Sequence, residues 1–331
     1  MSLRSNWTPF HAKLHQTLRS RHLLKRNQKL LIAVSGGQDS LCLIKLLLDL
    51  QPHWGWQLGI AHCDHRWRSD SEANANYVEQ LAKTWETSFY CSVADQPIKS
   101  EAAARQWRYQ ALSAIAQQNS YTCIVTGHTA SDRAETLLYN LMRGSGADGL
   151  QALTWQRPLD SVMLVRPLLD FTRTQTGQFC QEQQLKVWED ATNQDLKYAR
   201  NRIRSELLPY LHHFNPQVES ALAQTAELLQ ADVEYLEQAA SQLKQQAMPE
   251  ASSNENGESP FKLNCRVLQT APVALQRRVM RQVLQQILPC TPNFDQIQKL
   301  TALITASNNS RTDPLPGGAI AQVKNGWICI E

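Results

Sequence analysis

The fold of this chain is decided by residues 30–40, Leu-Leu-Ile-Ala-Val-Ser-Gly-Gly-Gln-Asp-Ser. One apolar run precedes the polar turn, and a second, residues 41–50, follows it. This order predicts a buried strand, a tight turn and a helix. Gly36 and Gly37 let backbone N–H groups close around an anion, and the helix start adds partial positive charge at the same point. The turn is therefore predicted to hold phosphate.

The turn differs from a Walker loop, because no Gly-Lys-Ser/Thr occurs and no lysine is supplied to the terminal phosphates. Asp39 stands there instead. A carboxylate among phosphates requires a divalent cation between them, so we expect Mg²⁺. A serine–glycine turn with a capping aspartate is the plainer alternative. The position between a strand and a helix favours the phosphate loop.

Strand and helix patterns alternate after the turn. Further strands are predicted at 57–61, 89–93 and 123–126, and helices at 73–86, 101–118 and 132–143. We expect an α/β fold with a doubly wound parallel sheet, helices on both faces, and ligands at the carboxyl ends of the strands. Polar residues follow these predicted strands directly, namely Ser35, His62, Asp64, His65 and His128.

The pattern changes in the second half of the chain. Glycines in 144–160 predict a mobile loop, and 162–165 predicts one more strand. Helices are predicted at 217–247, 272–287 and 293–306, and a hairpin is predicted around Asn325-Gly326. We therefore expect two domains, 1–216 and a smaller, mostly helical 217–331.

The composition limits the class of protein. A formal charge of +3 is too small to imply nucleic acid by itself, and 42% hydrophobic residues support two buried cores. The acid-free start is typical of transit peptides, but Thr8-Pro9 followed by apolar residues at helical spacing favours a folded helix. No apolar stretch is long enough to span a membrane, so we expect a cytoplasmic protein without membrane contact.

The eight cysteines are scattered, and several lie within apolar patterns. We expect reduced residues of the core. No pair has Cys-x-x-Cys spacing, which argues against a zinc ribbon or a cysteine-ligated cluster.

The turn resembles the pyrophosphate loop of the N-type ATP pyrophosphatases, the PP-loop family, which has an adenine nucleotide α-hydrolase-like fold. These enzymes attach AMP to a substrate oxygen and release pyrophosphate. The resemblance implies that ATP is bound by Ser35, Gly36, Gly37, Gln38, Asp39 and Ser40. Four later segments are similar to one branch of this family, the tRNA(Ile)-lysidine synthetases.

Residues 62–68, His-Cys-Asp-His-Arg-Trp-Arg, resemble the His-x-x-His-x-x-Arg segment of that branch, with His62, His65 and Arg68 matching. The family commonly has Asn where this chain has Asp64. As a metal site the segment is poor, because the flanking arginines repel a cation. A solvated polar loop remains the plain alternative.

Arg105 and Arg108 lie in an Ala-Arg-x-x-Arg-Tyr segment, whose arginines face the nucleotide or RNA in the family. Guanidinium groups suit this task because they hold phosphate through two N–H groups. Residues 127–136 resemble the family's Gly-His-x-x-Asp-Asp-x-x-Glu-Thr, with Ser131 in place of the first aspartate. The resemblance implies that Asp39 and Asp132 hold Mg²⁺, and that the catalytic residues are Asp39, Asp132, His128 and Asp64.

The resemblance implies that 1–216 is a catalytic domain and 217–331 a tRNA-recognition domain. The last match, residues 188–216, begins at Trp188-Glu-Asp190 and contains the dense positive cluster Arg200-Asn-Arg202-Ile-Arg204. Such clusters are usually solvated faces, but this one follows a predicted ATP site and is interpreted as a contact with RNA phosphates. We therefore expect contacts to tRNA or nucleotide from His62, His65, Arg68, Arg105, Arg108, Arg200, Arg202 and Arg204.

The resemblance implies ATP-dependent ligation of free L-lysine to C2 of the wobble cytidine, position 34, of a tRNA(Ile) with a CAU anticodon. An adenylated cytidine is the implied intermediate. The modification converts the tRNA from Met-type codon reading to Ile-type reading of AUA. The lysine amine needs a base, for which Asp64, Asp132 and Glu135 are candidates, followed by His62 and His128. A homodimer is left open.

Two other functions are kept open. Another PP-loop enzyme of tRNA modification, a cytidine-thiolating enzyme, would share the loop but would need cysteines for a cluster. A non-catalytic, ATP-gated RNA-binding protein would differ by releasing no pyrophosphate from ATP and tRNA.

Overall fold

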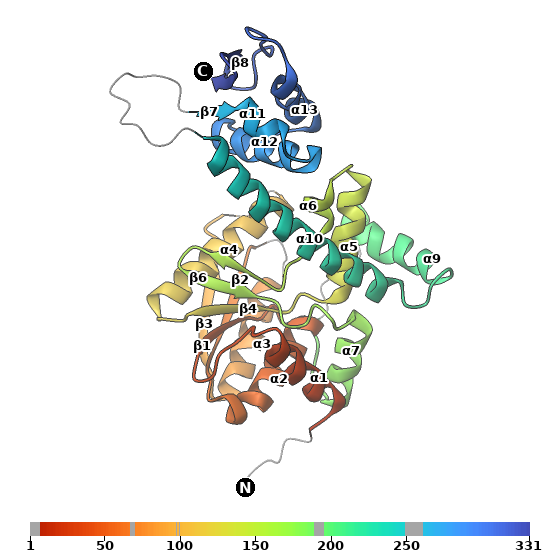
Figure 1. Cartoon of the computed structure of the whole chain (residues 1–331). Coiled ribbons are helices and arrows are strands. Elements are labelled where there is room, and N and C mark those ends of the chain that lie inside the picture. Colours follow the sequence, from red (N-terminus) through yellow and green to blue (C-terminus); the bar gives the residue numbers. More distant parts are fainter. Residues whose placement is uncertain (1–6, 67–69, 97, 99, 189–194, 249–260) are drawn as a thin grey trace. The chain divides into compact units, whose positions relative to one another are not determined.

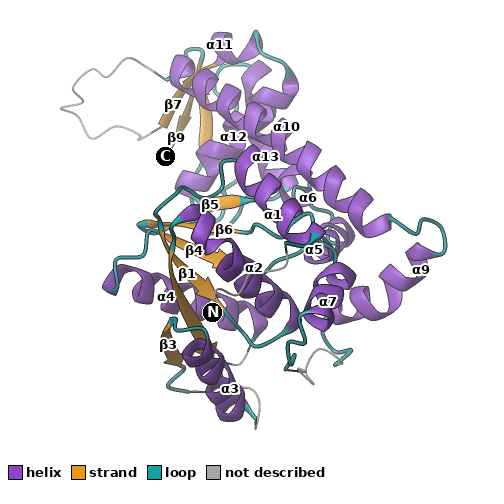
Figure 2. Cartoon of the chain, turned by 90° about the horizontal axis from the view of Figure 1, so that it is seen from below, coloured by secondary structure: helices purple, strands orange, loops and turns teal. Residues whose placement is uncertain are grey.

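The computed structural model describes residues 7–66, 70–96, 98, 100–188, 195–248 and 261–331. The chain forms two compact units, Met1–Gln230 and Ala231–Glu331. The division falls within one long helix, α10 (Val218–Ala247). Figure 1 colours the elements along the chain, and Figure 2 shows helices and strands from below.

Unit 1 is built on a six-stranded sheet in the order β3-β2-β1-β4-β6-β5. Its strands are β1 (Lys29–Ala33), β2 (Gln57–Asp64), β3 (Ser88–Val93), β4 (Cys123–Thr126), β5 (Gln156–Leu159) and β6 (Val162–Val165). All pairs are parallel except β5 with β6. The chain moves from β1 to β3 in one direction and then returns to β4 on the other side of β1, so the strand order reverses there. The predicted doubly wound sheet is confirmed.

Helices cover both faces of this sheet (Figures 1 and 2). Leu30 and Ile32 of β1 pack into a core shared with α1 (Pro9–Ser20), α2 (Gln38–Trp54), α3 (Ser71–Thr84) and α7 (Arg173–Glu182). Leu31 packs on the opposite face, against α4 (Glu101–Gln118). Successive side chains of a strand point to opposite faces, and here both faces are buried. This is why β1 is apolar at every central position.

A smaller core supports the elements that border the site. It joins α5 (Ala130–Met142), the π-helical turn η2 (Ile203–Leu207), α9 (Leu208–His212) and the start of α10. The short helix α8 (Ala199–Arg202) precedes η2. The loop predicted at 144–160 is wrong in part, because this segment contains α6 (Ala147–Leu150) and strand β5. Strand β5 has the sequence Gln-Arg-Pro-Leu and lies at the edge of the sheet, paired only with β6, so its sequence carries little strand signal.

Three other predictions meet different outcomes. The N-terminal helix is confirmed as α1, in which Leu14 and Leu18 are fully buried. Strand β2 runs to Asp64, so His62 and Asp64 lie in the end of the strand and do not follow it. All eight cysteines are free, but Cys91 and Cys290 are exposed, so the expectation of core cysteines is wrong for these two.

Unit 2 combines helices with a three-stranded antiparallel sheet in the order β7-β9-β8. Its elements are β7 (Phe261–Asn264), α11 (Cys265–Gln269), α12 (Val273–Ile287), α13 (Phe294–Ala302), the 3-10 turn η3 (Leu303–Thr305), β8 (Ala321–Lys324) and β9 (Trp327–Ile330). The predicted hairpin turns at Asn325 and Gly326, both with positive φ. None of the described helices is long and apolar enough to cross a membrane.

We expect Gly127→Ala to destabilise unit 1. Gly127 follows β4, and a Cβ there would lie 2.8 Å from the carbonyl oxygen of Asp39 and 3.1 Å from the backbone nitrogen of Ser40. Both are backbone atoms that cannot yield, so the free energy of unfolding should fall by about 1–3 kcal/mol. Denaturant unfolding measures this. Gly146→Ala is the control, because a Cβ there meets nothing within 4 Å. Equal stability of the two variants would refute the close approach.

Candidate active site

A cavity of about 650 Å³ lies at the carboxyl edge of the parallel sheet of unit 1. Its walls come from the turn after β1, the end of β2, helix α4, the segment after β4, and Arg173 and Arg204. This volume suits a ligand of nucleotide size. The cavity is therefore where a doubly wound sheet is expected to bind its ligand.

A second cavity, of about 280 Å³, adjoins the first. It reaches Glu135, Tyr198 and Arg200, which the larger cavity does not. The two cavities share five lining residues, which are Arg105, Arg108, His128, Asp132 and Arg204. The site thus has two compartments separated by charged and polar side chains.

The turn between β1 and α2 has the conformation of a glycine loop. Gly36 has a φ of +83°, and a Cβ on it would lie 2.4 Å from Oδ1 of Asn74. Asn74 donates to the carbonyl of Ser35 at 3.0 Å, and the backbone N–H of Trp188 donates to the carbonyl of Gly36 at 3.0 Å. The hydroxyl of Ser40 donates to the carbonyl of Gly37 at 2.8 Å. The acceptors of the turn are therefore satisfied by the protein, which suits a loop whose ligand is an anion.

Asp39 lies in the first turn of α2 and faces the larger cavity. Its Oδ1 accepts a hydrogen bond from Thr176, and its Oδ2 lies 3.6 Å from the guanidinium of Arg173. Burial raises the pKa of Asp39, Arg173 opposes this, and the negative charge of Asp132 raises it further. The two aspartates are therefore close enough to repel each other.

Asp132 is near the start of α5 and lines both cavities. Its Oδ2 accepts hydrogen bonds from the backbone N–H of Thr129 at 2.8 Å and from the Thr129 hydroxyl at 2.9 Å. Burial alone would raise the pKa of Asp132, but His128, Arg173 and the Thr129 N–H lower it below its usual value. Asp132 is thus an ionised carboxylate that also caps its helix.

His128 follows β4 and lines both cavities. Its Nδ1 lies 2.9 Å from the hydroxyl of Thr126. Burial, together with the charge of Arg166, lowers the pKa of His128 to about 3. The imidazole is therefore neutral at pH 7 and offers hydrogen bonds without adding positive charge.

Glu135, one helical turn after Asp132, is only 3% exposed. Arg204 donates two hydrogen bonds to Glu135, from Nε to Oε1 at 2.6 Å and from Nη2 to Oε2 at 2.7 Å. Burial raises the pKa of Glu135, and Arg204 opposes this. Arg204 also lies 3.7 Å from Asp132, so it belongs to the wall between the two cavities.

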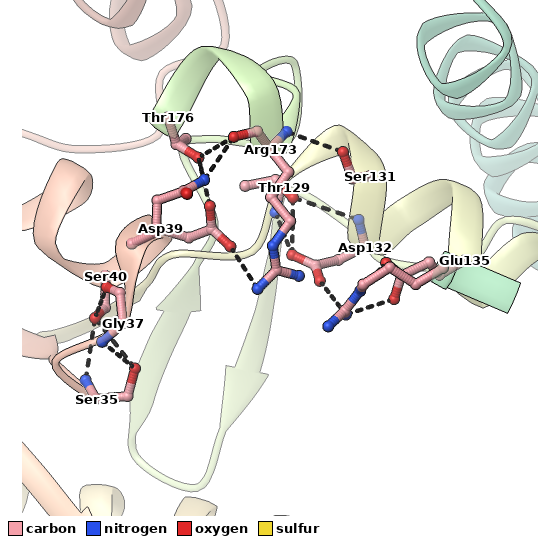
Figure 3. A network of polar contacts seen from close by, with 12 residues as sticks. Ser35, Gly37, Asp39, Ser40, Thr129, Ser131, Asp132, Glu135, Arg173 and Thr176 are labelled. Carbon is pink, nitrogen blue, oxygen red and sulfur yellow. Dashed lines mark hydrogen bonds and ion pairs between the residues drawn. The ribbon is translucent and has the colours of Figure 1, made fainter. Parts of the chain in front are cut away.

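Figure 3 shows Asp39 of α2, Asp132 and Glu135 of α5, and Arg173 of α7 close to one another. The backbone N–H of Arg173 donates to the hydroxyl of Ser131 at 2.9 Å, and Ser131 donates to Glu219 of α10. Ring nitrogen Nε2 of His212 lies 3.0 Å from the other oxygen of Glu219. Where the resemblance leads one to expect an aspartate, Ser131 therefore contacts a carboxylate from elsewhere in the chain.

The remaining predicted residues have different settings. His62 is buried, with Nδ1 2.8 Å from the carbonyl of Val34, and Asp64 accepts from the backbone N–H of Arg66 at 2.7 Å. His62, Asp64 and His65 line the larger cavity, and Arg68 lies outside the described residues. Arg105 and Arg108 line both cavities.

The arginines of the positive cluster separate in space. Arg200 lines the smaller cavity and pairs with Glu101 at 3.1 Å. Arg202 lines neither cavity, and its side chain is 63% exposed and pairs with Glu206 at 3.3 Å. Arg202 is thus the member of the cluster that faces solvent most openly.

Sequence reasoning missed the roles of Arg173, Thr176, Asn74 and Trp188, each of which contacts the turn or its aspartate. Trp188 begins the last of the segments similar to the family, but the other three belong to none of those segments. The one signal for α7 is the capping box formed by Thr172 and Gln175, which marks where the helix starts. A helix start by itself does not indicate that the following arginine will reach Asp39 across the fold.

Comparisons with known proteins agree with this geometry. Residues 7–211 match the PP-loop domain, and residues 263–326 match the TilS substrate binding domain. A tRNA(Ile)-lysidine synthase from Nostoc sp. is 69% identical over 333 residues, covering 98% of this chain and 97% of the relative. One from Synechococcus sp. is 51% identical, with coverage of 98% and 97%. A chloroplastic one from Zygnema circumcarinatum is 34% identical, with coverage of 96% and 89%.

Among solved structures, a U34-tRNA thiolase from Methanococcus maripaludis is similar with a TM-score of 0.58. The similarity covers 67% of this chain and 78% of the thiolase, at 15% identity. At this identity the likeness shows the shared fold alone.

We expect Ser131→Ala to destabilise the site. The change removes the acceptor of the Arg173 N–H and the donor to Glu219, so two buried or half-buried groups lose a partner. The free energy of unfolding should fall by about 1–3 kcal/mol. Ser205→Ala is the matched control, because Ser205 is exposed and bonds only within its own helical run. If both variants unfold at the same denaturant concentration, the Ser131 contacts contribute nothing.

Proposed function

The chain belongs to the tRNA(Ile)-lysidine synthase family, and from this premise we propose that it joins free L-lysine to C2 of cytidine 34 in a tRNA(Ile) with a CAU anticodon. ATP would first adenylate the C2 oxygen of the cytidine, and lysine would then displace AMP. We place this activity in the cytoplasm.

The observation that carries the proposal is the pair of adjoining cavities. The larger one contains the glycine turn and Asp39, and the smaller one contains Glu135. A ligation that consumes ATP and joins lysine to cytidine needs a compartment for the nucleotide next to one for lysine and the cytidine. Asp132 and Arg204 line both cavities and can therefore contact ligands in either one.

Asp39 and Asp132 fit a divalent cation, and we propose that they hold Mg²⁺. Both supply oxygen donors to one cavity. Burial and then the charge of Asp132 raise the pKa of Asp39, and a cation between the two carboxylates would offset both effects. Among the described residues, no three His, Cys, Asp or Glu side chains are placed to bind a metal by themselves. The remaining ligands would therefore be phosphate and water. Bound Mg²⁺ would neutralise phosphate charge during adenylation.

The pyrophosphate leaving group would lie at the turn and the start of α2, where backbone N–H groups and the helix dipole favour negative charge. Arg105 and Arg108 border the same cavity and can hold further phosphate or the RNA backbone. These groups stabilise the charge that moves to the leaving group when the α-phosphate is attacked.

Lysine presents a separate difficulty, because its free amine has a pKa of about 10.4 and releasing its proton at pH 7 costs about 4–5 kcal/mol. We propose Glu135 as the base. Its pKa is raised by burial, whereas that of Asp132 is lowered, so the two carboxylates are suited to different roles. Arg204 donates one hydrogen bond to each carboxylate oxygen of Glu135. Each oxygen has a second lone pair, so Glu135 can still accept a proton from the lysine amine.

Cytidine thiolation is less well supported. That chemistry needs a cysteine-ligated cluster, and none of the described residues form a group of three side chains able to bind a metal. All eight cysteines are described, and only Cys63 lines the larger cavity.

We expect Asp39→Asn to abolish pyrophosphate release from ATP and tRNA(Ile). The amide can still accept from Thr176 but lacks the charge that would hold the cation, so the rate should fall about 100-fold or more. Asp49→Asn is the control, since Asp49 is on the same helix outside both cavities. Wild-type release by Asp39→Asn would remove Asp39 from the mechanism.

Glu135→Gln should separate the two half-reactions. Pyrophosphate release should continue, whereas lysine transfer at pH 7 should fall about 10²- to 10⁴-fold because the base is missing. Transfer by the variant should recover as the pH approaches 10, where lysine loses its proton unaided. Rates of both steps, measured across pH, test this. A variant with the pH profile of the wild type would assign the base to another residue.

A further inference from the structure

Three aromatic rings form an exposed cluster at and after α9. Tyr210 is 61% exposed and Phe214 is 73% exposed. Their ring centroids are 5.3 Å apart, and the ring of His213 lies 6.4 Å from that of Tyr210. Both views of the chain show α9 at the outer edge of unit 1 (Figures 1 and 2). We call Tyr210, His213 and Phe214 the ring cluster.

The ring cluster does not contribute to the core beneath it. That core takes Leu207, Leu208 and Leu211 from the same run, while Tyr210 and Phe214 stay outside it. Most of the apolar surface of these two side chains stays exposed to water in the folded chain. Such an arrangement is typical of a binding surface.

The position of the ring cluster links it to the site. The run from Tyr198 to Phe214 begins at the smaller cavity, which is lined by Tyr198, Arg200 and Arg204. Tyr210 follows Arg204 by six residues, which is less than two helical turns. A nucleotide chain that delivers one base into the cavity therefore has its neighbouring bases within reach of the rings.

The charge of this run favours RNA over protein as the occupant. The run from Tyr198 to Phe214 carries Arg200, Arg202 and Arg204 against the single acid Glu206. Arg202, which precedes the rings, has an exposed side chain that pairs at the surface with Glu206. Clustered rings beside cations are the composition of surfaces that bind unpaired nucleotides, because bases stack on the rings while cations follow the phosphates.

We propose that the ring cluster is a stacking platform for unpaired bases of the tRNA anticodon loop next to the target cytidine. The proposal rests on the proposed function, since it takes the tRNA as substrate. A target base must leave its stack to enter a cavity, and its neighbours lose stacking as well. The rings of Tyr210 and Phe214 replace the lost stacking and hold the loop at the mouth of the site.

The test compares the double variant Tyr210→Ala/Phe214→Ala with the ring-retaining variant Tyr210→Phe/Phe214→Trp, using a tRNA(Ile) transcript. The alanine variant should bind tRNA at least 10-fold more weakly, because each stacked base contributes substantially to affinity. The dependence of Kd on salt should stay unchanged, since no charge is removed. The ring-retaining variant should bind as the wild type does, and KM for ATP should be unchanged in both. Tyr235→Ala, at a residue that is 72% exposed, is the control and should have no effect.

Several results would overturn the platform. Equal tRNA affinity of the alanine variant and the wild type would do so. A loss of affinity accompanied by a smaller salt slope would show a phosphate contact disrupted indirectly. A shift from dimer to monomer in sedimentation with tRNA affinity unchanged would assign the rings to a second copy of the chain. Lysine transfer by the wild type is measured in parallel, and its absence would refute the proposed function while the binding comparison still decides on the platform.

Discussion

The burial of two carboxylates, Asp39 and Asp132, at one cavity is the constraint on which the rest of the site depends. Two carboxylates that face one cavity, one of them with its pKa raised by burial, can stay together only if positive charge is supplied. Arg173 supplies it from α7 and Arg204 from η2. ATP with a bound cation would supply more, which explains why a protein that uses ATP would retain this costly pair.

Helix α5 connects the carboxylates of the site to helix α10. Its first turns carry Asp132 and Glu135 toward the cavities, while Ser131 and Arg133 point to the first half of α10. Arg133 is fully buried and lies 3.3 Å from Glu227, whose carboxylate also pairs with Arg21. A buried guanidinium that lost its carboxylate partner would be costly, so these contacts help to hold the orientation of α5 and with it the positions of Asp132 and Glu135.

Much of the fold and part of the site could be predicted from the sequence because the signals are local. The apolar run before Ser35 and the two glycines mark the strand and the turn. The Asn325-Gly326 pair marks the hairpin. Long-range contacts leave no such signal. The reach of Arg173 to Asp39 depends on how α7 packs against α2, and the turning of Arg204 toward Glu135 depends on the π-helical turn η2.

We propose that the protein uses the two cavities to join lysine to a nucleoside activated by ATP. The most direct measurement is mass spectrometry of cytidine 34 from tRNA(Ile) after incubation with the protein, ATP and isotopically labelled lysine. We expect the nucleoside to gain the mass of lysine less one water and to carry the label. An unchanged cytidine, or one in which sulfur has replaced the C2 oxygen, would contradict it.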